Sequence, residues 1–209
     1  MQRLAVRGGE PVRKKPFPRW PSFDEDEVKE LLEALREGPW SVGSSKIKLF
    51  EEEFSSFHQA RYGVACTSGS TALFVCLKAL GIGVGDEVVV PAYTFLATAS
   101  TVIDSGAMPL IVDVDPDTYT ISPQAVEAAL TEKTKCIIPV HLAGCPANMD
   151  EIIRVAERNG LKVLEDAAQA HGAEWDGKKV GSIGSCAAFS FYQSKNMTAG
   201  EGGIITTND

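Results

Sequence analysis

The sequence predicts an α/β fold in which helices cover both faces of a mainly parallel sheet. Short apolar runs typical of buried strands alternate along the chain with longer segments of helical periodicity. Such alternation indicates a parallel sheet between two helical layers. With 209 residues, 44% hydrophobic and 23% charged, the chain is long enough to bury one substantial core.

The predicted elements begin after an irregular N-terminal arm. Residues 1–23 interleave prolines with basic residues, and we expect this arm to need a partner surface to become ordered. The rest of the chain, 24–209, is expected to form one domain. Apolar spacing and cap residues predict helices at 24–37, 46–59, 70–81, 96–105, 122–130 and 148–159. Strands are expected at 87–90, 110–114, 136–140, 162–165, 187–191 and 203–206, and a short apolar run at 62–65 precedes the third helix.

The composition argues against several classes of function. A net charge of -8 and the absence of a dense Lys/Arg run give no footprint for nucleic acid or for an anionic membrane. No run approaches the ~20 apolar residues that span a bilayer, and the first residues lack the apolar stretch of a signal peptide, so we expect a cytoplasmic protein. The five cysteines lack C-x-x-C spacing and are expected to be reduced core residues. The three histidines share no metal-ligand spacing, so no catalytic metal is expected.

One lysine, Lys195, lies between a strand-like run and a glycine-rich turn. The run FSFYQSK ends at this residue, and TAGEGG follows at 198–203. A lysine held in a walled site can lose its proton and form a Schiff base with a carbonyl compound. Because an isolated lysine is more often a solvated surface group, this interpretation needs partners elsewhere in the chain.

Two other segments supply such partners. Asp166 ends an apolar run at the position where open α/β sheets present groups to a ligand. The segment CTSGST at 66–71 opens a helix, where glycine lets the backbone approach an anion and free N–H groups favour negative charge. A phosphate seat, a strand-end carboxylate and a lysine match the needs of pyridoxal 5'-phosphate (PLP). The carboxylate would keep the pyridine nitrogen protonated, while the lysine would bond to the cofactor and move protons.

With these segments in place, the chain resembles the DegT/DnrJ/EryC1/StrS family of PLP-dependent aminotransferases, within the aspartate-aminotransferase-like fold type I group. Further matching blocks are GDEVVVPAYTF at 85–95, VDVDPDTY at 112–119, IPVHLAG at 138–144 and EDAAQAHG at 165–172. The resemblance implies a three-layer α/β/α large domain with one antiparallel strand, for which 203–206 is the candidate. The sequence stops at Asp209, so the resemblance also implies an incomplete large domain without the smaller C-terminal domain that closes over the substrate.

The resemblance assigns roles to the candidate residues. Lys195 would bond to the cofactor and act as proton shuttle, Asp166 would pair with the pyridinium nitrogen, and Gln169 would lie beside the phenolic oxygen. A structural hydrogen bond is expected for His171 in preference to a catalytic role. The phosphate would be held by Gly69, Ser70, Thr71 and Ser190.

Some of these residues also have simpler interpretations. Phe95 would stack on the cofactor, with Tyr93 as second choice because both are expected on one side of a strand, yet both could be core aromatics. Asp166 could cap the turn that follows it, and Ser70 and Thr71 could be ordinary helix-cap residues. Their occurrence together in one chain order favours a cofactor site.

The resemblance implies amino transfer from glutamate or glutamine to a keto-sugar or keto-cyclitol, by a homodimer, in amino-sugar, polysaccharide or secondary-metabolite biosynthesis. Related sugar dehydratases carry histidine in place of Lys195, so this lysine favours transamination. Tyr192 stands where many nucleotide-sugar members have histidine, and the segments TAGEGG and GGEPVR are similar to members that act on cyclitols or make aminobenzoate precursors. The alternative is a non-catalytic or fragmentary PLP-binding or subunit-interaction module that lacks the substrate-closing domain.

Overall fold

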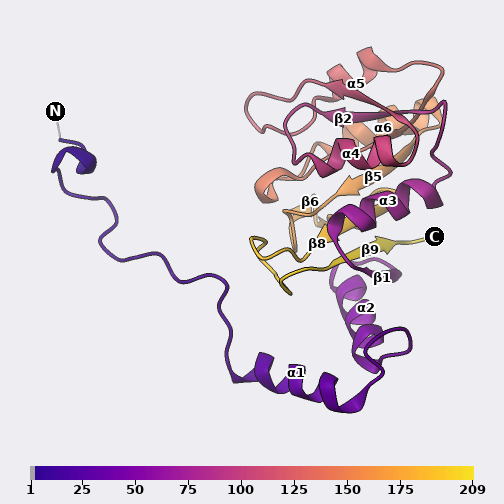
Figure 1. Ribbon diagram of the computed structural model, residues 1–209. Helices are drawn as coiled ribbons and strands as arrows, with labels where there is room; N and C mark the ends of the chain where they lie inside the picture. Colours follow the sequence, from indigo (N-terminus) through magenta and orange to yellow (C-terminus); the bar gives the residue numbers. More distant parts are fainter. Residues whose placement is uncertain (1–2) are drawn as a thin grey trace.

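The computed structural model describes residues 3–209 and contains a seven-stranded sheet flanked by helices (Figure 1). The strands lie in the order β1-β9-β8-β5-β4-β2-β3. Their bounds are β1 Tyr62–Cys66, β2 Glu87–Pro91, β3 Met108–Val112, β4 Thr134–Ile137, β5 Lys162–Asp166, β8 Cys186–Ser190 and β9 Gly203–Thr207. The helices are α1 Glu25–Glu37, α2 Ser45–Phe57, α3 Gly69–Ala79, α4 Ala97–Asp104, α5 Pro123–Ala129 and α6 Met149–Asn159.

One strand of this sheet runs against the others, as expected. β9 pairs antiparallel with both β1 and β8, whereas the pairs among β3, β2, β4, β5 and β8 are parallel. The expectation that 203–206 is the antiparallel strand is therefore confirmed. In consequence, β9 joins β1 to the parallel part of the sheet.

Side chains alternate between the two faces of the sheet, as the period of a strand requires. Val88 and Val90 of β2 pack in a core with α3 and α4, whereas Val89 between them packs in a second core with α5 and α6. A third core lies between α2, β8 and β9, where Phe54 meets Phe189. The expected three-layer arrangement is thus present.

The helices begin where the sequence predicted them, within one or two residues. Asp24 forms a capping box with Glu27 at the start of α1, and Ser122 caps α5 ahead of Pro123. Asn148 caps α6, whose first turn carries Asp150 and Glu151. Local chemistry therefore determines these helix starts.

Two strands differ from their predicted bounds for local reasons. β3 ends at Val112 instead of residue 114, because Asp113 and Asp115 accept hydrogen bonds from nearby backbone N–H groups and turn the chain. β4 ends at Ile137 instead of residue 140, because Pro139 has no N–H for the ladder. The sequence did not predict the small hairpin of β6 (Glu174–Trp175) and β7 (Lys178–Lys179), whose strands are too short to show periodicity.

The described part of the N-terminal arm, from residue 3, contains a single 3₁₀ turn at Ala5–Arg7 and is almost entirely exposed (Figure 1). Trp20 contacts the body, where its indole Nε1–H donates a 2.8 Å hydrogen bond to the carbonyl of Gln193. Among residues 3–209, no helix combines the length and the apolar character that a membrane crossing requires.

The cysteines are only in part the core residues that the sequence predicted. Cys76, Cys136 and Cys186 are buried, Cys66 is half-buried, and Cys145 is exposed. All five are free thiols. Cys145 is exposed because it follows a 3₁₀ turn in the loop between β4 and α6, outside any strand.

Candidate functional site

A cavity of about 240 Å³ lies where the carboxyl ends of β5 and β8 meet the first turn of α3. This is the edge of an open α/β sheet at which ligands bind. It brings together residues that are far apart in the sequence. Its lining includes Ser68, Gly69, Ser70, Phe95, Asp166, Gln169, Ser190, Tyr192, Ser194, Lys195 and Glu201.

The start of α3 forms one wall of this cavity. Ser68 is the N-cap, and its Oγ accepts a 3.1 Å hydrogen bond from the backbone N–H of Thr71. The first helical hydrogen bond runs from Ala72 N–H to Ser68 O, so the N–H groups of Gly69 and Ser70 have no partner within residues 3–209. Two free N–H groups at the positive end of an eleven-residue helix make a seat for an anion.

Thr71 does not line the cavity, although the sequence grouped it with the phosphate-holding residues. Its hydroxyl instead lies 3.0 Å from Ser68 Oγ and 3.1 Å from Thr67 Oγ1. Ser68, which the sequence did not single out, takes a place in the wall. Its identity as an N-cap residue is the feature that could have identified it.

Glycine is required where this wall contacts the sheet. A Cβ on Gly69 would lie 2.7 Å from the Cβ of Ser190, closer than side-chain carbons approach. A Cβ on Gly203 would lie 2.4 Å from the carbonyl oxygen of Ser68. Gly69 and Gly203 therefore let α3, β8 and β9 meet at the cavity.

Asp166 is the acidic group of the cavity and lies at the last position of β5. It is 5% exposed, and its Oδ2 accepts a 2.7 Å hydrogen bond from the hydroxyl of Thr98. Its Oδ1 accepts a 3.2 Å bond from the N–H of Ala168, so it also caps the following turn as the simpler interpretation proposed. Burial raises the pKa of this carboxyl, while Thr98, Ala168 and the charge of Lys195 act in the opposite direction.

Lys195 reaches the same cavity from the loop between β8 and β9. Its side chain is half-buried, and its backbone N–H donates a 2.9 Å hydrogen bond to the carbonyl of Tyr192. Thr198 Oγ1 and Ala199 N–H both donate to the carbonyl of Phe191, which closes the loop onto the end of β8. An amine and a carboxylate that share one cavity can together hold and move protons.

Phe95 and Tyr93 lie in a loop and not on a strand, because β2 ends at Pro91. The expectation that strand periodicity places them on one side is therefore wrong. Phe95 is 68% exposed and lines the cavity, whereas Tyr93 packs against the ring of Tyr119 at 5.9 Å. Of the two aromatic residues, Phe95 has the position from which a ring could stack on a ligand.

Gln169 lies between this cavity and a wider neighbouring hollow of about 680 Å³ that also contains Lys195. Its Oε1 accepts a 3.0 Å hydrogen bond from the N–H of Ala143, which fixes the amide. His171 lines the hollow, and its Nδ1–H donates a 2.7 Å bond to Oδ1 of Asn196, directly after the lysine. The histidine thus holds the lysine loop through a side-chain hydrogen bond.

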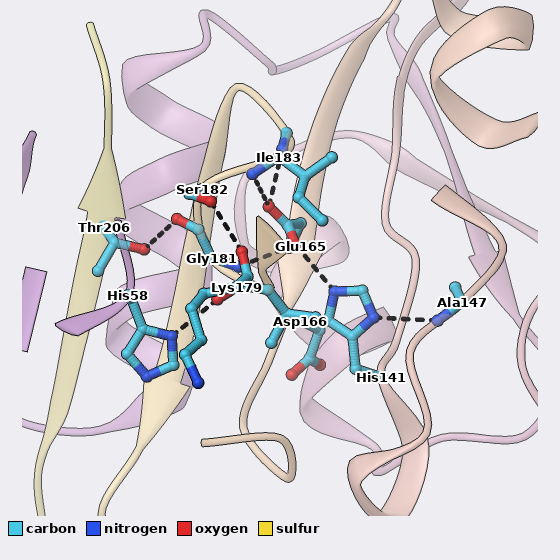
Figure 2. Close-up of polar contacts among 12 residues, drawn as sticks. His58, His141, Ala147, Glu165, Asp166, Lys179, Gly181, Ser182, Ile183 and Thr206 are labelled. Atoms are coloured by element: carbon cyan, nitrogen blue, oxygen red, sulfur yellow. Dashed lines mark hydrogen bonds and ion pairs between the residues drawn. The ribbon is translucent and has the colours of Figure 1, made fainter. Parts of the chain in front are cut away.

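A second carboxylate, Glu165, is completely buried beside Asp166, but the two consecutive side chains point in different directions (Figure 2). One oxygen accepts a 2.9 Å hydrogen bond from Nε2–H of His141, whose Nδ1 accepts from the N–H of Ala147. This pattern makes His141 the neutral Nε2–H tautomer and Glu165 the charged partner. The remaining bonds to Glu165 come from the backbone N–H groups of Gly181, Ile183 and Gly184.

Burial by itself would raise the pKa of Glu165, but the hydrogen bonds from His141, Gly184 and Gly181 outweigh it and lower the pKa. Through these hydrogen bonds, Glu165 of β5 holds two loops in place: the loop after β4, which contains His141, and the loop after β7, which contains Gly181 and Gly184. In addition, the backbone N–H of His141 donates a 3.1 Å hydrogen bond to the backbone carbonyl of Asp166. The Glu165–His141 pair therefore fixes the strand end that carries Asp166.

The fold and the cavity together define a class of protein. It is an α/β protein with an anion-binding helix start, a buried carboxylate and an amine at the carboxyl edge of its sheet. Comparison with known proteins agrees. A profile of the DegT/DnrJ/EryC1/StrS aminotransferase family matches residues 21–209. The chain belongs to this family.

Relatives and solved structures extend the comparison. The chain is 43% identical over 212 residues to an L-glutamine:2-deoxy-scyllo-inosose aminotransferase from Streptomyces fradiae, covering 99% of this chain and 50% of that protein. The crystal structure of 3-amino-5-hydroxybenzoic acid synthase superposes with a TM-score of 0.91 at 45% identity, covering 93% of this chain and 51% of that one. A Streptococcus pneumoniae protein in its PLP form superposes with a TM-score of 0.87 at 35% identity, covering 91% and 52%. The chain therefore spans about half the length of the curated relatives it matches.

Proposed function

We propose that this chain carries the cofactor-binding part of a PLP-dependent aminotransferase. The observation that carries the proposal is the single cavity shared by the start of α3, Asp166 and Lys195. Each of the three has a separate electrostatic task toward one cofactor. The family membership and the PLP form of a similar structure support the same conclusion.

The residues of the cavity fit this cofactor. The free N–H groups of Gly69 and Ser70, with the hydroxyls of Ser68 and Ser190, suit a phosphate. The buried Asp166 suits a protonated ring nitrogen, and the exposed ring of Phe95 suits a flat aromatic face. We therefore assign the phosphate of PLP to the start of α3, its ring to Asp166 and Phe95, and its aldehyde to Lys195.

When bound, PLP supplies an aldehyde that links to amines and a ring that withdraws electrons from the adjoining carbon. Asp166 would favour the proton on the ring nitrogen, because hydrogen bonds from Thr98 and Ala168 orient its two carboxylate oxygens. Lys195 would hold the cofactor through its amine and would be the base for the Cα proton of the amino donor, because it lines the same cavity. Gln169, whose amide oxygen is fixed by Ala143, keeps its NH₂ group free and would donate it to the ring oxygen.

We further propose that the amino donor is glutamine or glutamate and that the acceptor is a keto-cyclitol or keto-sugar. The similarity to an L-glutamine:2-deoxy-scyllo-inosose aminotransferase supports this substrate class. The hollow of about 680 Å³ beside Lys195 and His171 is the space in the described chain where such a polar ring could lie. The lining of that hollow is rich in hydrogen-bonding groups.

A second copy of the chain is the partner that we propose. Helix α1 contains no buried residue, yet Leu31 is 63% and Leu35 is 52% exposed on it. An amphipathic helix with an uncovered apolar side gains stability when another surface covers it. Light scattering tests this assignment by comparing the molar mass of the unchanged chain with that of the double variant Leu31→Glu/Leu35→Glu. A dimer that persists in the double variant contradicts the assignment.

Reduction of the PLP-loaded chain with borohydride, followed by peptide mapping, tests the cofactor assignment. We expect one reduced adduct, on Lys195, and none in Lys195→Ala. Lys179 is the matched control, because this half-buried lysine pairs with Glu174 and does not line the PLP cavity. Adducts spread over surface lysines, or retained in Lys195→Ala, contradict the proposal.

A single-turnover assay with glutamine or glutamate then separates an enzyme from a binding module. Conversion of the bound cofactor to its amino form shows that Lys195 and Asp166 perform the first half-reaction in this chain. Binding and trapping without conversion favour the alternative of a cofactor-binding module that depends on further chain segments.

A further inference from the structure

A buried hydroxyl from another helix reaches the carboxylate of the cavity. Thr98 of α4 is fully buried, and its Oγ1 lies 2.7 Å from Oδ2 of Asp166, 68 residues away in the chain. The Oγ1 of Thr94 lies 2.7 Å from the same hydroxyl. Because a carboxylate only accepts, Thr98 donates to Asp166 and receives its own hydrogen bond from Thr94. The three groups form a directed chain that ends at the carboxylate.

The hydroxyl of Thr98 bonds outside its own helix, because Thr98 is the second residue of α4 and no helical residue lies four positions before it. A buried threonine commonly satisfies its hydroxyl on the carbonyl four residues earlier in its own helix. Thr101, one turn further along α4, does this with a 2.8 Å bond to Ala97 O and is 3% exposed. Thr98 directs its hydroxyl to another element instead. Thr101 is therefore a matched residue with the same side chain, helix and burial but no contact with the site.

Asp166 depends on such donors to remain charged. The groups that face it are the hydroxyl of Thr98 from α4, the N–H of Ala168 from the following turn, the charge of Lys195 and the imidazole of His141 from the loop after β4. Its burial acts against the charged form, and of these groups Thr98 is the side chain that hydrogen-bonds to it. A hydrogen bond to an ionised acceptor is also stronger and more directional than one between neutral groups.

We propose that Thr98 is a positioning residue that orients the carboxylate of Asp166 and keeps it charged toward the ring nitrogen of the cofactor. This inference rests on the proposed function. Oδ2 is held by Thr98 and Oδ1 by Ala168, so the carboxylate cannot rotate without breaking one bond. Each oxygen retains a second acceptor position for the ring N–H.

Three variants test the proposal by PLP titration: Thr98→Val, Thr98→Ser and Thr101→Val. Thr98→Val keeps the size of the side chain but removes the donor, and we expect it to weaken PLP affinity about tenfold, the effect of losing one hydrogen bond to a charged group. Because the loss favours the protonated carboxyl, the weakening should grow as the pH falls. Thr98→Ser should restore affinity, and Thr101→Val should leave affinity and its pH profile unchanged.

A second measurement needs no cofactor. Loss of Thr98 raises the pKa of Asp166 further, and a carboxyl whose folded pKa exceeds its unfolded value loses stability as the pH rises through that interval. The denaturant midpoint of apo Thr98→Val should therefore fall further below that of the unchanged chain as the pH rises from acid to neutral. The deficit of Thr101→Val should not vary with pH. Thr98→Ala provides the same comparison if Thr98→Val is insoluble.

The outcomes separate this inference from the function on which it rests. Failure of the unchanged chain to bind PLP refutes the proposed function, while the apo comparison still reports on Thr98 and Asp166. A Thr98→Val variant that matches Thr101→Val in PLP affinity, in pH profile and in apo stability overturns the assignment of Thr98.

Discussion

Glu165→Gln should destabilise the fold strongly, although it changes one oxygen to an NH₂ group. The Glu165 side chain is completely buried, and each of its oxygens accepts two hydrogen bonds. One oxygen serves His141 and Gly181, and the other serves Ile183 and Gly184 (Figure 2). Whichever way the glutamine amide is oriented, its NH₂ group faces two N–H donors.

The size of the effect follows from these contacts. Each donor that loses its acceptor in a buried site is destabilising by about 1–3 kcal/mol. Two such donors predict a loss of about 2–6 kcal/mol in the free energy of unfolding, a large part of the stability of an ordinary domain. His141 cannot relieve the clash by changing tautomer, since its Nδ1 already accepts from Ala147.

Denaturant unfolding followed by circular dichroism measures this loss. The matched control is Glu127→Gln, since Glu127 is exposed and its ion pair with Arg158 should contribute at most about 1 kcal/mol. The folded pKa of Glu165 lies below its ordinary value of 4.5, so its stabilisation is present above that pH and is lost as the pH falls through the folded value. The stability difference between the unchanged chain and Glu165→Gln should therefore shrink as the pH falls through the same interval. A variant as stable as Glu127→Gln at neutral pH would refute the reasoning.

Three further predictions concern other parts of the chain. Gly203→Ala places a Cβ 2.4 Å from the carbonyl oxygen of Ser68, so we expect a fall in melting temperature and weaker PLP binding; an unchanged melt contradicts the close approach. Burial lowers the pKa of His58 to about 4, against an ordinary value of 6.5, so stability should fall by about 3 kcal/mol as the pH drops through this interval. His58→Gln keeps a donor for Val180 O and should remove that pH dependence, which unfolding at several pH values measures. Lys195→Ala should abolish the proposed amino transfer yet leave the free energy of unfolding of the apo chain within about 0.5 kcal/mol, because the half-buried side chain makes no hydrogen bond or ion pair within residues 3–209; a large loss of apo stability contradicts its functional assignment.

Several features of the cavity could be predicted from local sequence. Gly69 and Ser70 lie at a helix start whose cap chemistry is encoded in neighbouring residues, and Asp166 ends a short apolar strand. Lys195 adjoins a glycine-rich turn that leads into β9. The cavity also contains Gln169, Ser190 and Phe95, which the family resemblance had named. Their roles toward a cofactor remain predictions that the trapping and titration experiments test.

Other features required tertiary structure. Thr98 is an ordinary helical threonine in the sequence, and only the fold brings the first turn of α4 to the end of β5, where its hydroxyl meets Asp166. Glu165 and His141 are 24 residues apart and show no metal-ligand spacing, so sequence alone could not indicate that they form a buried pair. Phe95 was expected on a strand, but Pro91 ends β2 before it.

The sequence by itself determined the order of helices and strands, the helix starts and the separate chemistry of the lysine, the aspartate and the glycine-rich segments. These depend on backbone preferences and side-chain period, which act over a few residues. Tertiary structure alone decided which hydroxyl, which histidine and which backbone N–H groups surround each carboxylate. Those contacts join residues tens of positions apart, and their strength depends on burial, which no local pattern specifies.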